Sequence, residues 1–139
     1  MTSSTVQPGA DAPPNARAMR ILLVEDHTDT REGLRRMLER SGHHVKGAAT
    51  CADALIMAAE MSVGRLDVVV SDVGLPDGDG VELMQTIMSR HACRAVALTG
   101  WGSPEDLQRY EAAGIDRWFI KPIEVDALVR ALDALVGSS

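Results

Sequence analysis

Short apolar runs alternate with amphipathic segments along most of this chain of 139 residues, and the alternation limits the possible folds. Runs in which every residue is apolar are typical of strands covered on both faces, as in a parallel sheet. A weaker run mixes polar and apolar residues, as an edge strand would. The strands are therefore predicted at 21–24, 44–48, 68–70, 95–98 and 118–120.

The amphipathic segments between these runs carry signals for helix ends. Asp29, Thr50 and Ser103 each precede an acidic residue by three positions, which is typical of a helix N-cap. Gly42 is expected to end the first helix, and residues 77–80 are interpreted as the turn before the third. Strand and helix alternate five times, which predicts an α/β fold with helices on both faces of a parallel sheet.

Composition indicates one folded domain. The first 18 residues hold three of the six prolines and few bulky apolar side chains, so we predict a disordered tail at 1–18 and a domain at 19–137. A net charge of −6 argues against direct binding to nucleic acid or anionic membranes. The chain shows neither a membrane-spanning run nor a signal peptide, so the expected compartment is the cytoplasm. Cys51 and Cys93 are interpreted as reduced thiols.

Polar side chains follow four of the predicted strands. Glu25 and Asp26 follow the first strand, Asp72 the third, Thr99 the fourth and Lys121 the fifth. In a doubly wound sheet these strand ends converge on one crevice. Three carboxylates in one pocket repel each other, so we expect a divalent cation and the Lys121 ammonium among them. Mg²⁺ is commonly held by one or two carboxylates together with a phosphate.

These residue types suit phosphoryl transfer. The Asp72 carboxylate can attack phosphorus as a nucleophile and form an aspartyl phosphate. Mg²⁺ and Lys121 would neutralise charge on the transferring group, and the Thr99 hydroxyl can donate a hydrogen bond to a phosphoryl oxygen. His27 follows the acidic pair directly and is interpreted as a solvated loop residue.

Four stretches carry a family resemblance: ILLVED at 21–26, VVVSDVGLPDGDG at 68–80, ALTG at 97–100 and IKP at 120–122. In this order, each at a predicted strand end, they resemble the receiver domain of two-component response regulators, over roughly residues 19 to 136. The resemblance implies the flavodoxin-like (βα)5 fold, with a five-stranded parallel sheet of order 2-1-3-4-5.

The resemblance also implies roles for individual residues. Asp72 would be phosphorylated, and with Lys121 and Thr99 it would form the catalytic set; Thr99, Lys121 and an aromatic switch residue would respond to the phosphoryl group. The implied magnesium ligands are Glu25, Asp26, Asp72 and the backbone carbonyl of Gly74, and the implied aromatic switch residue is Trp118.

The implied phosphoryl donor is a phosphohistidine on a sensor histidine kinase or a histidine phosphotransfer protein. The implied output is contact with a downstream protein, or a homodimer, through the fourth helix, fifth strand and fifth helix, near 104–136. Such a receiver is not an enzyme, since it catalyses only its own phosphoryl transfer and slow self-dephosphorylation. No output domain follows Ser139, so we expect a single-domain regulator.

Two positions depart from the commonest family pattern. Trp118 stands where Tyr or Phe is usual, and its bulk predicts a smaller conformational response. Gly74 has no side chain to orient an attacking water, which predicts slow hydrolysis of the acyl phosphate.

Three other functions compete with this interpretation. A haloacid-dehalogenase-type phosphatase also uses a strand-end Asp, but it needs a second Asp where this chain has Gly74. A pseudo-receiver would act by surface contacts without phosphorylation. A receiver excised from a hybrid histidine kinase is the third alternative, because ALTGWG at 97–102 also resembles those proteins.

Overall fold

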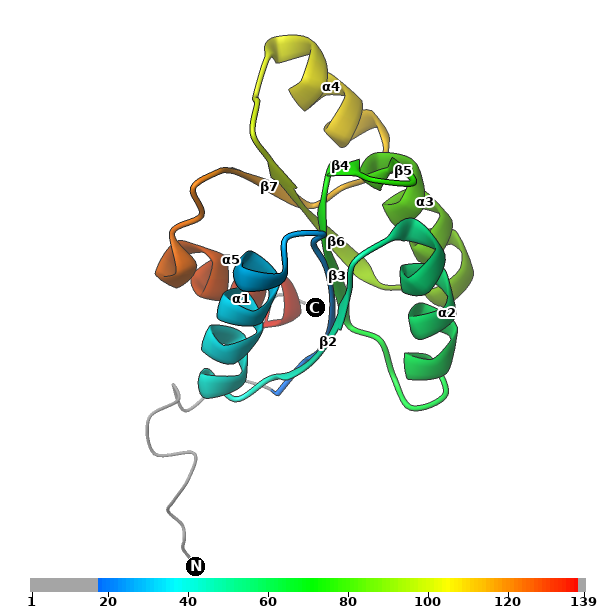
Figure 1. The fold of residues 1–139 in the computed structure, drawn as a ribbon, viewed down its shortest axis with the longest axis vertical. Helices are drawn as coiled ribbons and strands as arrows, with labels where there is room; N and C mark the ends of the chain where they lie inside the picture. The colour runs from blue at the N-terminus through cyan, green and yellow to red at the C-terminus, as the bar shows by residue number, and fades with distance from the viewer. Residues whose placement is uncertain (1–17, 138–139) are drawn as a thin grey trace, which may run out of the picture.

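The computed structural model describes residues 18–137, and their central element is a parallel sheet. Its order is β2-β1-β3-β6-β7, which confirms the predicted order 2-1-3-4-5 (Figure 1). The predicted tail at 1–18 lies outside the described residues except for Ala18, so the domain boundary stays a prediction. The strands are β1 (Arg20–Val24), β2 (His44–Ala48), β3 (Val68–Asp72), β6 (Arg94–Thr99) and β7 (Arg117–Ile120).

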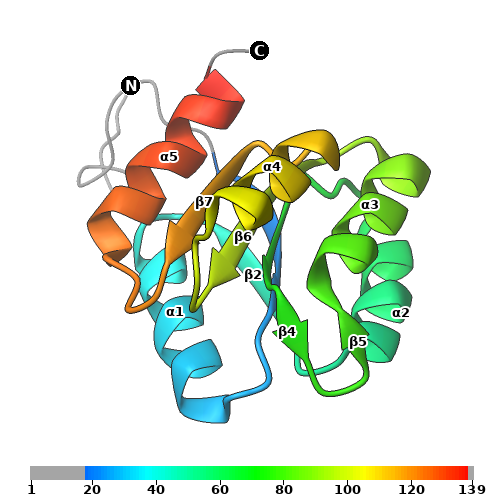
Figure 2. The same ribbon diagram turned by 90° about the horizontal axis from the view of Figure 1, so that it is seen from above.

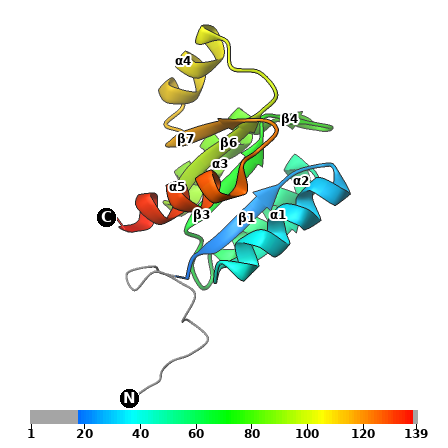
Figure 3. The ribbon, with the colours of Figure 1, turned by 90° about the vertical axis from the view of Figure 1, so that its left-hand side faces the viewer.

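Five helices surround this sheet within the described residues. They are α1 (Thr28–Arg40), α2 (Cys51–Met61), α3 (Gly80–His91), α4 (Pro104–Ala112) and α5 (Val125–Gly137). Helices α1 and α5 cover one face and α2 and α3 cover the other (Figure 2). Helix α4 lies beyond the β7 edge, apart from the other four (Figures 1 and 3). No helix among residues 18–137 is long and apolar enough to cross a membrane.

Each face of the sheet carries its own apolar core. Alternate residues of a strand point to opposite faces, so Leu22 packs on the α2–α3 side while Ile21 and Leu23 pack on the α1–α5 side. All five residues of β3 are buried. This two-sided burial is the physical reason that the central strands appear in the sequence as continuous apolar runs.

Two of the three predicted helix caps are confirmed. The Thr50 hydroxyl accepts a hydrogen bond from Asp53 N–H, and the Ser103 hydroxyl accepts one from Asp106 N–H. The prediction for Asp29 is wrong, because α1 begins at Thr28 with His27 as its N-cap, and no side chain caps it. Asp29 instead lies in the first helical turn, where its negative charge favours the positive end of the helix dipole.

A short hairpin precedes α3, where the sequence indicated only a turn. Strands β4 (Gly74–Leu75) and β5 (Gly78–Asp79) pair antiparallel. Two acidic side chains in this region cap helices. Asp77 accepts hydrogen bonds from the first two N–H groups of α2, at Cys51 and Ala52, and Asp79 accepts one from Val81 N–H of α3.

Gly80 allows α3 to begin directly against the backbone of Asp72. A Cβ atom at position 80 would lie 1.9 Å from the Asp72 carbonyl oxygen, closer than non-bonded atoms can approach. The Gly80 N–H donates to the Val73 carbonyl at 2.7 Å. The start of α3 therefore sets the position of the chain at the carboxyl end of β3.

Candidate functional site

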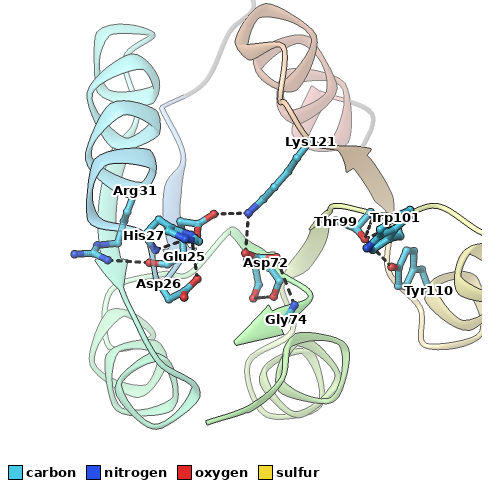
Figure 4. Close-up of polar contacts among 11 residues, drawn as sticks. Glu25, Asp26, His27, Arg31, Asp72, Gly74, Thr99, Trp101, Tyr110 and Lys121 are labelled. Atoms are coloured by element: carbon cyan, nitrogen blue, oxygen red, sulfur yellow. Dashed lines mark hydrogen bonds and ion pairs between the residues drawn. The ribbon is translucent and has the colours of Figure 1, made fainter. Parts of the chain in front are cut away.

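Polar side chains from three strand ends meet around one ammonium group. Lys121 follows β7, and its Nζ lies 2.7 Å from Oδ2 of Asp72 at the end of β3. The same nitrogen lies 2.8 Å from Oε1 of Glu25, which follows β1 (Figure 4). The structure thus brings together three predicted site residues that are far apart in the sequence.

Glu25 is a fully buried carboxylate with both oxygens hydrogen-bonded. Oε1 accepts from Lys121, and Oε2 accepts from the backbone N–H of His27 at 3.1 Å. Burial alone would raise the pKa of Glu25, but the hydrogen bonds from Lys121 and His27 outweigh burial and hold it below its ordinary value. Arg31 of α1 donates to the Glu25 backbone carbonyl at 2.8 Å, which anchors this turn.

The backbone of Lys121 is held by the neighbouring strand β6. Its backbone N–H donates to the Thr99 carbonyl at 2.7 Å, and the Lys121–Pro122 peptide bond is cis. Burial alone would lower the pKa of the Lys121 ammonium, but the hydrogen bonds to Asp72 and Glu25 raise it above its ordinary value. Lys121 is therefore a fixed positive charge at neutral pH.

Asp26 and His27 lie at the more exposed side of the site. One ligand atom from each of Glu25, Asp26 and His27 lies within 4.8 Å of the others, a spacing that could hold a cation. His27 is solvated, as expected, with 75% of its side chain exposed. Its Nδ1 nevertheless lies 3.3 Å from Oε2 of Glu25, a contact that the sequence did not indicate.

The oxygen donors of the site suit magnesium. The carboxylates of Glu25 and Asp72 flank the Lys121 ammonium, and Asp26 lies beside Glu25. Three carboxylates and one ammonium leave two formal negative charges for a divalent cation to offset. Hard carboxylate oxygens are the ligands that Mg²⁺ prefers. Asp26, with 34% of its side chain exposed, is the most accessible of these three carboxylates.

Asp72 and Gly74 stand at the start of the hairpin. Asp72 is buried, and its Oδ1 lies 3.4 Å from the backbone nitrogen of Gly74. The Ser71 hydroxyl donates to the Asp72 backbone carbonyl at 2.9 Å. Gly74 is exposed, and a Cβ added to it would meet nothing within 4 Å. A larger side chain would therefore fit at position 74.

Thr99 is buried at the end of β6, but its hydroxyl does not bond to Asp72. It donates to the Trp101 carbonyl at 2.6 Å and accepts from Trp101 N–H at 3.1 Å. It also accepts from the Tyr110 hydroxyl at 3.2 Å. Figure 4 shows Thr99, Trp101 and Tyr110 grouped on the side of Asp72 away from Glu25 and Asp26.

Trp118 lies on β7 and is half-buried. Its ring centroid is 6.2 Å from that of Tyr110 on α4, with the planes tilted by 54°, a spacing typical of favourable aromatic pairs. Sequence reasoning assigned the aromatic role to Trp118 alone. Tyr110 was missed because nothing in a single sequence shows that this face of α4 packs against Thr99.

Comparison with known sequence families identifies the family to which the chain belongs. The pattern described as the response regulator receiver domain matches residues 21–133. The chain belongs to the response regulator receiver family. Receiver domains act in two-component signalling, pair with histidine kinases and typically bind Mg²⁺.

Two curated relatives match this chain over different fractions of their own length. The transcriptional regulatory protein PdtaR of Mycobacterium tuberculosis is 28% identical over 137 residues, which cover 99% of this chain and 63% of PdtaR. The sensor histidine kinase AruS of Pseudomonas aeruginosa is 36% identical over 127 residues, which cover 88% of this chain and 12% of AruS. The receiver therefore spans less than two thirds of each of these relatives.

A solved structure supports the fold. The CheY-like response regulator receiver domain protein from Methanospirillum hungatei is 26% identical to this receiver, with a TM-score of 0.76. The match covers 88% of this chain and all of that one. The predicted flavodoxin-like fold is confirmed.

Proposed function

We propose that this receiver accepts a phosphoryl group on Asp72 from a phosphohistidine and uses Mg²⁺ to do so. The observation that carries the proposal is the position of Lys121, which bridges the buried carboxylates of Asp72 and Glu25 at 2.7 and 2.8 Å. A lysine held between two carboxylates at the carboxyl end of a parallel sheet provides positive charge where a phosphoryl group attached to Asp72 would lie.

In the proposed reaction, a carboxylate oxygen of Asp72 attacks phosphorus, and the P–N bond to the donor imidazole breaks. The imidazole keeps the bonding electrons and takes up a proton as it leaves. Lys121 stabilises negative charge on the transferring oxygens, and the Thr99 hydroxyl donates a hydrogen bond to one of them. Glu25, Asp26, Asp72 and the Gly74 carbonyl would hold Mg²⁺, which when bound would supply positive charge beside the phosphoryl oxygens.

The proposed donor is a sensor histidine kinase or a histidine phosphotransfer protein. The proposed output is contact with a downstream protein, or a second copy, through the surface of α4, β7 and α5. Ile120 of β7 and Trp101, in the loop before α4, are large apolar residues with 53% and 80% of their area exposed. A partner that covers these two side chains would remove apolar surface from water.

Two alternatives remain distinct proposals. A pseudo-receiver would keep the fold without accepting phosphate, but the contacts of Lys121 with Asp72 and Glu25 favour a working acceptor site. The match to a short part of AruS supports the second alternative, in which the chain corresponds to the receiver of a hybrid kinase.

Intact mass measurement after incubation with a small-molecule phosphodonor and Mg²⁺ tests the proposal. Wild type should gain the mass of one phosphoryl group, and chelation of Mg²⁺ should prevent the gain. Asp72→Asn is the matched control, because it keeps the size of the side chain and removes the nucleophile. If wild type stays unmodified while remaining folded, the pseudo-receiver alternative replaces this proposal.

A further inference from the structure

The hydroxyl group of Thr99 uses all of its hydrogen-bonding capacity in contacts away from Asp72. A hydroxyl has one donor and two acceptor positions. The donor goes to the Trp101 carbonyl, and the acceptors take the Trp101 N–H and the Tyr110 hydroxyl. Thr99 must therefore break its bond to the Trp101 carbonyl before it can donate to anything attached to Asp72, and turning the hydroxyl towards Asp72 would also take it away from the Tyr110 hydroxyl.

Tyr110 is the main anchor of α4. It is 2% exposed and is the only buried residue of this nine-residue helix. Its ring packs in the core on the α2–α3 side of the sheet and faces Trp118 of β7. A displacement of the Tyr110 side chain would therefore change how α4 sits on the domain.

The hydrogen bond between these two residues joins the site to that helix. The Tyr110 hydroxyl donates to Thr99 at 3.2 Å, and both residues are buried. A buried hydroxyl that loses its only partner pays a desolvation penalty. The state in which Thr99 faces Asp72 must therefore either leave the Tyr110 hydroxyl without this acceptor or move Tyr110 with its helix.

We propose that Tyr110 is a positioning residue that holds Thr99 in the unphosphorylated arrangement and passes the movement of Thr99 to α4. The aromatic partner of the switch hydroxyl in this chain is thus Tyr110, and Trp118 serves as the surface against which the Tyr110 ring packs. This inference rests on the proposed phosphorylation of Asp72.

A second contact limits how α4 can respond. Arg109, next to Tyr110, forms an ion pair with Asp79, the residue that caps α3. This pair lies at the surface, whereas the Tyr110 hydroxyl is inside the domain. The ion pair ties α4 to the hairpin, and Tyr110 ties it to the end of β6, so release of the Thr99 bond leaves one of the two attachments in place.

The test compares Tyr110→Phe with wild type by titrating beryllofluoride, a phosphoryl mimic, in the presence of Mg²⁺. Phenylalanine keeps the ring against Trp118 and removes only the hydroxyl. Wild type loses the Tyr110–Thr99 bond on binding, whereas the variant has none to lose. We expect Tyr110→Phe to bind beryllofluoride about threefold to tenfold more tightly, the factor that one hydrogen bond of ordinary net strength represents.

A double-mutant cycle separates positioning from packing. In a Thr99→Ala background, Tyr110→Phe should leave beryllofluoride affinity unchanged, because its effect acts through the Thr99 hydroxyl. A purely structural effect of the tyrosine would persist in that background. Glu111→Gln, an exposed change one position along the same helix, reports any general effect of altering α4.

The outcomes distinguish this inference from the proposed function. If wild type gains no phosphoryl group from a small-molecule donor, the proposed function fails and this inference fails with it. If wild type is phosphorylated but Tyr110→Phe binds beryllofluoride like wild type, or if its effect survives in Thr99→Ala, the role of Tyr110 alone is refuted.

Discussion

The ammonium nitrogen of Lys121 lies 2.7 Å from Oδ2 of Asp72, which joins the end of β3 to the residue that follows β7. The same nitrogen satisfies the fully buried carboxylate of Glu25. A buried charge without its partner is strongly unfavourable. The lysine therefore offsets the charge of Glu25 and hydrogen-bonds to both carboxylates.

Replacing Lys121 should reverse the pH dependence of the stability that Glu25 contributes to the fold. In wild type, the pKa of Glu25 is below its ordinary 4.5, so its contribution to stability is present above pH 4.5 and lost as pH falls through the folded-state pKa. The pKa of Lys121 is above its ordinary 10.5, so its contribution is present below pH 10.5 and lost as pH rises through the folded-state value.

In Lys121→Met, burial would raise the pKa of Glu25, and the variant should lose stability as pH rises from 4.5 towards neutrality. We expect a loss of about 2 to 3 kcal/mol at neutral pH, measured by urea unfolding without Mg²⁺. Arg94→Met breaks the partly exposed pair with Asp116 and should cost less than about 1 kcal/mol. A difference between Lys121→Met and wild type that does not vary with pH would contradict this account.

Gly80→Ala should destabilise the domain and displace Asp72. The added Cβ would lie 1.9 Å from the Asp72 carbonyl oxygen, so the backbone must shift, and we expect a loss of about 3 kcal/mol in the free energy of unfolding. Gly33→Ala is the matched control on α1, where a Cβ meets nothing within 4 Å. Because alanine favours helix, this control should gain about 1 kcal/mol. Equal effects at the two positions would show that close packing at Gly80 is unimportant.

Gly74→Asn should shorten the lifetime of the phosphorylated protein, a prediction that depends on the proposed function. The position has open space for the side chain, and an amide can orient a water molecule towards phosphorus. We expect loss of the phosphoryl group to accelerate by roughly tenfold, since an amide positions water without exchanging a proton. Intact mass against time measures the rate, with Gly74→Ala as the control for the added Cβ. The idea fails if Asn and Ala behave alike.

Asp77→Asn should make one of the two cysteines more reactive. Burial, followed by the charge of Asp77 and its hydrogen bond to the thiol, raises the pKa of Cys51 to about 11. Burial also raises the pKa of Cys93 to about 11. Because the thiolate is the reactive form, both should alkylate slowly at neutral pH in wild type. In Asp77→Asn the rate at Cys51 should rise while the rate at Cys93, an internal control, stays constant; peptide mass mapping distinguishes the two.

Local sequence patterns predicted two of the three helix caps correctly, and the failure of the third has a physical reason. Thr50 and Ser103 cap their helices because a hydroxyl three residues before an N–H acts locally. Asp29 fits the same pattern but lies inside α1, because the turn after β1 is held by Glu25 and Arg31 and brings the chain into helix at Thr28. The start of that helix depends on contacts with the sheet.

The apolar runs by themselves predicted the parallel sheet, because strands buried on both faces must be apolar throughout. The polar residues that follow those runs predicted that Glu25, Asp72 and Lys121 would meet, because the carboxyl ends of parallel strands lie at one edge of the sheet. Only the tertiary structure decided which groups those side chains bond. The approach of Gly80 to Asp72 and the bond from Tyr110 to Thr99 depend on how α3 and α4 rotate and settle against the sheet. Packing between distant segments sets those orientations, so they cannot be inferred from the order of residues within one segment.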